Sequence, residues 1–367
     1  MSGWMGLAHR AWSLLPYKFR ASGLAAKLRN RLRPEETNVA PAMISLPAAP
    51  AIPARPAPQA ASPRIISTLD ELDEMLRMLD AAAAVSDDEL RRGFMTFTMN
   101  FPMNIDADPD SEAYREHQLK LYGWLHGKPY AVSNEVCEFD VNTLADSPFP
   151  FCTQSCPTVG NHLIAIGHLI RTVDLKPNSR ILEFGPGWGN TTTFLARMGH
   201  RVKAVDIEMN FVRLIEERGR RNNLEIDAVQ DDFSLIHRLD EKFDLVLFFE
   251  CFHHCSNHQA LIAGLDHVIA PGGKAVFGAE PITDAFPIPW GLRLDGESLW
   301  AIRKNGWLEL GFQETYFRGL LARHGWQVEK KVCAETPWGV VFVATRSAPK
   351  PGAATEPAAA PRQREKP

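Results

Sequence analysis

The amino-acid sequence predicts an α/β fold with a mostly parallel, doubly wound sheet, preceded by an N-terminal helical region. Short apolar runs alternate with segments of helical spacing over residues 158–346, as in sheets covered by helices on both faces. The last two runs are too close in sequence for a crossover helix, so they must pair antiparallel. The predicted strands are residues 180–184, 201–206, 225–230, 243–249, 274–280, 326–332 and 340–345. The predicted helices between them are residues 159–173, 190–198, 210–222, 259–269 and 313–324.

A glycine-rich turn follows the first predicted strand, with Gly185, Gly187 and Gly189 in a G-x-G-x-G spacing. Glycines let the backbone approach a ligand closely, and the N-terminus of the next helix offers free N–H groups. A dinucleotide turn reads G-x-G-x-x-G, and Asn190 stands where its third glycine would be. Glu183, two residues before the turn, would repel a pyrophosphate and suits a cationic amino-acid ligand. The turn therefore predicts a nucleotide-type site that does not hold a dinucleotide.

Acidic residues stand at three predicted strand ends, namely Glu183, Asp206 and the pair Asp231 and Asp232. Because parallel strands share one carboxyl edge, these acids should surround one pocket. This order of motifs resembles the class I S-adenosylmethionine-dependent methyltransferase family, of the small-molecule and glycan type with a type 11/12-like domain. The resemblance covers residues 158–346 and includes the reversed C-terminal strand. It implies a Rossmann-like methyltransferase sheet and S-adenosyl-L-methionine as the cofactor.

The resemblance also implies roles in binding this methyl donor. Glu183 is expected near the methionyl amino group and Asp206 at the ribose hydroxyls. Asp232 is expected to accept from the adenine amino group, with Phe233 beside the ring. The family often has glycine where this chain has Asp231, so the choice between the two acids stays open. The complete expected donor set is Glu183, Gly185, Gly187, Gly189, Asn190, Asp206, Ile207, Asp232 and Phe233.

The candidates for a general base follow the fourth predicted strand and are Glu250, His253 and His254. A hydroxyl acceptor must lose a proton, and His254 matches the histidine that closes this segment in the family. The alternative is that His254 bonds backbone groups in a turn while Glu250 only shapes the pocket. The same run also contains Cys251, Cys255 and His258. A strand-to-helix turn should splay these side chains apart, so the sequence predicts no metal site.

The rest of the chain divides into segments by composition. Residues 1–34 are basic and acid-free, and three interpretations stay open: docking on a membrane surface, a targeting presequence, or an arm that binds a protein partner or stays unordered. A Pro/Ala-rich linker at 35–64 and a disordered tail at 347–367 are expected. Residues 65–157 are expected to be helical and to cover the acceptor site. An insertion at 281–311 carries three tryptophans suited to a polar ring, or to a purely structural lid.

Composition restricts the class of function. The net charge is −4, and no basic and aromatic stripe crosses the core, so no nucleic-acid partner is expected. Sparse cysteines and the lack of a long apolar run predict a cytoplasmic protein, with peripheral membrane contact left open for residues 1–34. The sequence predicts methyl transfer to a small molecule or saccharide, at oxygen. The alternative is a non-catalytic scaffold or regulatory protein that binds S-adenosylmethionine. The oligomeric state is not predicted.

Overall fold

The structure is a computed structural model that describes residues 62–100, 107–135 and 137–346. The basic arm at 1–34, the tail at 347–367 and nearly all of the linker at 35–64 lie outside the described residues, so the predictions for them stay predictions. Arg64, the last residue of the predicted linker, is the first residue of strand β1 (Arg64–Ile66). Within the described ranges, no helix combines the length and the apolar character needed to cross a bilayer.

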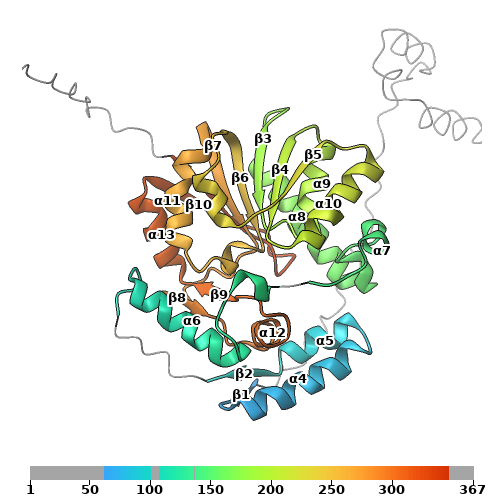
Figure 1. The fold of residues 1–367 in the computed structure, drawn as a ribbon, viewed down its shortest axis with the longest axis vertical. Helices are drawn as coiled ribbons and strands as arrows, with labels where there is room; N and C mark the ends of the chain where they lie inside the picture. The colour runs from blue at the N-terminus through green and yellow to red at the C-terminus, as the bar shows by residue number, and fades with distance from the viewer. Residues whose placement is uncertain (1–61, 101–106, 136, 347–367) are drawn as a thin grey trace, which may run out of the picture. The chain divides into compact units, whose positions relative to one another are not determined.

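Seven strands form one sheet in the order β10-β11-β7-β6-β3-β4-β5 (Figure 1). The neighbours from β5 to β7 pair parallel, whereas β11 is antiparallel to both β7 and β10. The predicted mostly parallel sheet with an antiparallel C-terminal strand is therefore confirmed. The strands are β3 (Arg180–Phe184), β4 (Arg201–Asp206), β5 (Ile226–Gln230), β6 (Phe243–Phe249), β7 (Ile269–Gly278), β10 (Trp326–Val332) and β11 (Val340–Arg346).

Alternate residues of the inner strands pack on opposite faces of this sheet, as the two-residue period of a strand requires. On β3, Leu182 joins a core cluster with α11 and α13, while Ile181 joins a second cluster with α8 and α9. Helices therefore cover both faces, and the doubly wound arrangement is confirmed (Figure 1). The helices of this layer are α8 (Cys156–Val173), α9 (Asn190–Arg197), α10 (Met209–Asn222), α11 (His258–Val268) and α13 (Glu314–Arg323).

The fifth strand differs from its prediction at the end that matters for the site. β7 stops at Gly278, because Ala279 has a φ of 56° and turns the chain. The N–H of Ala279 donates a 2.8 Å hydrogen bond to the carbonyl of Val340. Glu280 is therefore not part of the strand and instead follows the carboxyl edge of the sheet.

The buried face of α8 carries two histidines besides apolar residues. His162 and His168 are buried together with Ile166 and Leu169, whereas Leu163 is 39% exposed. The helix predicted at residues 159–173 is therefore present, and polar groups share its buried face.

The N-terminal region and the insertion pack against each other below the sheet in Figure 1. Thr68 caps α4 through a capping box with Glu71, whose N–H lies 3.2 Å from Thr68 Oγ1. On α6, Tyr114 and Tyr122 donate their hydroxyls to carbonyls of the insertion. The elements of these parts are α4 (Leu69–Ala83), α5 (Asp87–Phe94), β2 (Phe97–Met99), α6 (Glu112–His126), α7 (Val141–Asp146), β8 (Trp290–Leu292), α12 (Gly296–Trp300) and β9 (Leu310–Phe312).

Candidate active site

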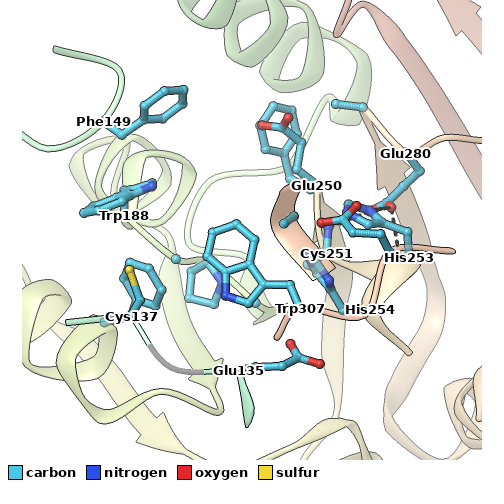
Figure 2. Close-up of a pocket in the computed structure, with 18 of the residues that line it drawn as sticks. Glu135, Cys137, Phe149, Trp188, Glu250, Cys251, His253, His254, Glu280 and Trp307 are labelled. Carbon is cyan, nitrogen blue, oxygen red and sulfur yellow. Dashed lines mark hydrogen bonds and ion pairs between the residues drawn. The ribbon is translucent and has the colours of Figure 1, made fainter. Parts of the chain in front are cut away.

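A cavity of about 650 Å³ lies where β3, β4, β6 and β7 end (Figure 2). Residues of the glycine turn and of the strand ends form one wall. Residues of α5, α12 and the insertion, including Arg91, Glu297 and Trp307, form the opposite wall. Of the residues expected in the site, Glu183 and Gly189 do not line the cavity and all the others do.

The three glycines of the turn have positive φ angles but different surroundings. Gly187, at φ 49°, lines the cavity, and no protein atom lies within 4 Å of the place that a Cβ would occupy. An added Cβ at Gly185 would come within 2.5 Å of Cys251 Cβ, and one at Gly189 within 2.6 Å of Ile215 Cγ1. Gly187 therefore leaves open space for a ligand, whereas the other two glycines allow close packing.

Glu183 is completely buried behind the first turn of α9. Its Oε2 accepts a 2.6 Å hydrogen bond from Thr192 Oγ1, and its Oε1 accepts one from Thr191 Oγ1. Burial raises the pKa of this carboxyl to about 7, although the two hydroxyl donors act in the opposite direction. Because Thr191 lines the cavity and Glu183 does not, the geometry supports action on a ligand through the threonine, not by direct contact.

Asp206 ties the glycine turn to the end of β4. Its Oδ2 accepts a 3.0 Å hydrogen bond from Gly187 N–H, and its Oδ1 accepts one of 3.0 Å from Glu208 N–H. Burial raises the pKa of this carboxyl to about 6, and the backbone donors limit the increase. Asp206 and the adjoining Ile207 both line the cavity.

The two acids after β5 also line the cavity but have different partners. Asp231 accepts a 2.6 Å hydrogen bond from the guanidinium of Arg238, which lowers its pKa against the effect of partial burial. Asp232 caps η3 (Phe233–His237) by accepting a 2.7 Å bond from Ser234 N–H. Because Arg238 pairs with Asp231, Asp232 is the acid of the pair that keeps more capacity to accept from a ligand.

Asn190 lines the cavity beside the turn. Its Nδ2 donates a 2.7 Å hydrogen bond to the carbonyl of Phe149. Its Oδ1 is buried and has no hydrogen-bond partner in the described part of the chain. A buried acceptor without a partner is unfavourable, so a ligand donor at this point would stabilise it.

Glu250 follows β6 with a φ of 53°, a conformation that few non-glycine residues adopt. Its N–H donates a 3.0 Å bond to the carbonyl of Gly278, which fixes the turn. Its Oε2 lies 3.4 Å from Nε2 of His162 on α8, and its side chain is 32% exposed. Glu250 therefore presents a partly accessible carboxylate to the cavity, with an imidazole beside it.

His253 and His254 lie on the short turn η4 (Phe252–His254), with ring centroids 4.2 Å apart. Nδ1 of His253 is 2.7 Å from Glu280 Oε2, and its Nε2 is 3.6 Å from Glu309 Oε2. Burial lowers the pKa of His253, but the two carboxylates outweigh it and raise the pKa overall. Burial, with His253 alongside, holds the pKa of His254 well below its usual range. The two histidine rings therefore lie side by side, whereas Cys251 donates to the carbonyl of Phe184 and His258 packs against Trp290. The expectation that this turn splays its side chains apart is wrong for the two histidines.

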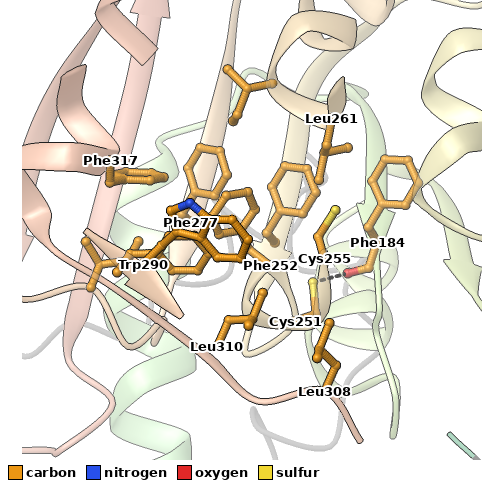
Figure 3. Close-up of a cluster of buried hydrophobic side chains, with 14 of the residues drawn as sticks. Phe184, Cys251, Phe252, Cys255, Leu261, Phe277, Trp290, Leu308, Leu310 and Phe317 are labelled. Carbon is orange, nitrogen blue, oxygen red and sulfur yellow. Dashed lines mark hydrogen bonds between the residues drawn. The ribbon is translucent and has the colours of Figure 1, made fainter. Parts of the chain in front are cut away.

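The turn that carries the histidines is fixed from both sides. The Glu280 carboxylate accepts hydrogen bonds from the N–H groups of Cys251 and Phe252, both 2.9 Å, and of His253, 3.2 Å. Phe252 is completely buried and packs against Phe277, with ring centroids 5.0 Å apart (Figure 3). The positions of His253 and His254 are thus set by a buried carboxylate and an aromatic core.

The insertion contributes two of its three tryptophans to the cavity. Trp300 and Trp307 line it, whereas Trp290 is buried elsewhere and donates Nε1–H to the carbonyl of Pro109 at 2.7 Å. Trp338, which precedes β11, is a further lining residue that the sequence did not single out.

Several other site residues were also missed from the sequence. Glu280 could have been found, since it is an acid at the carboxyl end of a predicted strand, as Asp206 is. His162, Arg91 and Glu309 gave no such signal, because they come from a buried helix face, the N-terminal region and the insertion.

The sheet order and the cavity at the strand ends agree with the resemblance to class I methyltransferases. The family model that matches the chain is described as a methyltransferase domain and covers residues 182–277. The match to this family is thus limited to residues 182–277, which are less than half of the chain.

Curated relatives carry related names at low identity. A ubiquinone biosynthesis O-methyltransferase of Coxiella burnetii is 26% identical over 118 residues, which are 30% of this chain and 50% of that protein. One of Xanthomonas oryzae pv. oryzae is 28% identical over 140 residues, which are 34% of this chain and 58% of that protein. The chain thus spans about half the length of the curated relatives that it matches.

Among solved structures, the Burkholderia thailandensis 1,6-didemethyltoxoflavin-N1-methyltransferase, with bound 1,6-didemethyltoxoflavin and S-adenosylhomocysteine, is 19% identical. The similarity covers 66% of this chain and 94% of that chain, with a TM-score of 0.41.

Proposed function

We propose that this protein transfers a methyl group from S-adenosylmethionine to an oxygen atom of a small polar molecule or saccharide. The observation that carries this proposal is that one cavity joins the glycine turn, the strand-end acids and the partly accessible Glu250 carboxylate to an opposite wall with tryptophans. Methyl transfer needs the donor and the acceptor together in one enclosed space with the reacting atoms aligned.

The donor-side residues fit this cofactor. Gly187 leaves open space beside the turn, and Asn190 Oδ1 lacks a partner. Asp206 is proposed to accept from the ribose hydroxyls and Asp232 from the adenine amino group. Glu183 is proposed to position Thr191 against the methionyl end of the donor.

Glu250 is the proposed general base. Both ring nitrogens of His253 face carboxylates, and the lowered pKa of His254 makes it a weak base, so Glu250 is the most suitable of the three candidates. When bound, the donor supplies a methyl carbon activated by its sulfonium. Glu250 takes the acceptor's hydroxyl proton as the oxygen–carbon bond forms and the carbon–sulfur bond breaks, with the bonding pair going to sulfur.

The acceptor wall favours a polar ring. Trp300, Trp307 and Trp338 line the cavity, and Arg91 and Glu297, 3.8 Å apart, line it with them. A sugar packs an apolar face on an indole while charged groups bind its hydroxyls. The names of the ubiquinone O-methyltransferase relatives add support for an oxygen target.

The test begins with calorimetry of S-adenosylhomocysteine and NAD, of which only the first should bind. Labelled donor is then incubated with phenols, nucleotide sugars, lipid-linked glycans and amines. We expect transfer to hydroxyl oxygens, and transfer only to amines would reject the proposed acceptor class. Glu250→Gln should lower kcat by about 100-fold or more while the affinity for S-adenosylhomocysteine stays unchanged. Donor binding without turnover on any acceptor would instead favour the scaffold alternative.

A further inference from the structure

The turn η4 and the insertion bring together metal-ligand side chains to which the proposed methyl transfer gives no role. Within the described residues, ligand atoms of His253, His254 and Glu309 all lie within 4.8 Å of one another. The two histidines are neighbours on η4, and Glu309 immediately precedes β9, so the group forms only when the insertion packs on the sheet edge. All three residues line the cavity.

The hydrogen bonds of both histidines leave the same ring nitrogen available. Nδ1 of His253 lies 2.7 Å from a carboxylate oxygen of Glu280, and Nδ1 of His254 lies 2.7 Å from the carbonyl oxygen of Leu308. An oxygen at this distance makes Nδ1 the protonated nitrogen and leaves the Nε2 lone pair as the ligand. Metal-binding histidines are commonly held in this way by a second oxygen.

The spacing is close to that of a first-row metal site. Ligands at about 2.0–2.2 Å from a tetrahedral zinc ion stand about 3.4 Å apart. Nε2 of His253 and Oε2 of Glu309 are 3.6 Å apart, which fits. No two of the three ligand atoms are more than 4.8 Å apart, so side-chain adjustments of at most about 1.4 Å would bring them to this spacing.

Carboxyl groups outnumber the arginines near the three residues. Glu135, Glu280, Glu297 and Glu309 line the cavity, with Arg293 3.4 Å from Glu309 and Arg91 3.8 Å from Glu297. Carboxylates taken out of water need a compensating charge. A protonated His253 between Glu280 and Glu309 is the competing arrangement, and it predicts no metal binding.

We infer that His253, His254 and Glu309 bind one divalent transition-metal ion of the zinc class at the wall of this cavity. Two imidazoles and one carboxylate are the ligand set of metal centres that keep a coordination position open for water or substrate. Because Glu250 lines the same cavity, an acceptor hydroxyl bound at that open position would lose its proton more readily. Only this last step depends on the proposed function.

The test titrates Co²⁺ into the full-length, untagged protein and follows visible absorption, with Zn²⁺ as competitor. We expect one Co²⁺ per chain, displaced by Zn²⁺, without the charge-transfer bands of a thiolate ligand. His254→Gln and Glu309→Gln should each weaken Co²⁺ binding by more than about 100-fold, since even outer-shell partners contribute about 10–100-fold. His162→Gln is the matched control, because it breaks a different histidine–glutamate pair of the same cavity and should leave Co²⁺ binding unchanged.

Thermal denaturation and S-adenosylhomocysteine affinity report on the fold of each variant. A protein that binds S-adenosylhomocysteine but no Co²⁺ would overturn the inference, as would thiolate bands or equal Co²⁺ affinity in all three variants. If one ligand variant unfolds, the other and the unmodified protein still decide the result. Co²⁺ bound at these residues in a protein that methylates nothing would overturn the proposed function and leave the metal site standing.

Discussion

Replacing Gly187 with alanine separates the role of the turn in binding from its role in folding. Gly187 has a φ of 49°, and an added Cβ would meet no protein atom within 4 Å. The left-handed conformation costs a non-glycine residue about 1–2 kcal/mol, and the open space adds no clash. We expect Gly187→Ala to lower the free energy of unfolding by that amount. Because the new methyl group would occupy space assigned to the donor, affinity should fall at least about tenfold, or about 1.4 kcal/mol.

The matched control is Gly199→Ala, at the turn between α9 and β4. Gly199 has a φ of 90°, also has nothing within 4 Å of an added Cβ, and does not line the cavity. Both variants should unfold at similarly reduced denaturant concentrations, but only Gly187→Ala should bind S-adenosylhomocysteine more weakly by calorimetry. Equal affinity in the two variants would refute the placement of the donor against this turn.

The other predictions concern stability, donor binding and acceptor binding. Glu183→Gln should remove a pH dependence of the free energy of unfolding. Burial raises the pKa of this carboxyl to about 7 from its ordinary value of 4.5. The wild-type protein should therefore lose about 3 kcal/mol of stability relative to the variant as the pH rises between these two values. Denaturant melts at pH 5 and pH 8 measure this, and parallel curves would contradict it. Asp232→Asn should weaken the binding of S-adenosylhomocysteine more than Asp231→Asn does. The reverse order would assign the adenine contact to Asp231. Trp307→Ala should raise the acceptor KM about tenfold without changing donor affinity, and an unchanged KM would remove Trp307 from the acceptor site.

The sheet was largely predictable because its signals are local. Apolar runs, the glycine turn and the acids at strand ends are each contained in a few consecutive residues, and the parallel topology follows from their alternation. The short connection before β11 likewise fixed the antiparallel strand. The sequence did not decide where side chains are placed by distant contacts, as for the buried histidines of α8 and for Trp290, which is buried while Trp300 and Trp307 line the cavity.

By itself, the sequence determined a doubly wound sheet and a donor-type turn with acids at one edge, because strand period, turn chemistry and crossover length are properties of neighbouring residues. Only the tertiary structure decided that Glu183 is sealed behind Thr191 and Thr192, and that His253, His254 and Glu309 meet. Burial and proximity depend on how the insertion and the N-terminal region pack over the sheet edge. Those contacts join residues far apart in the chain, which no local pattern records.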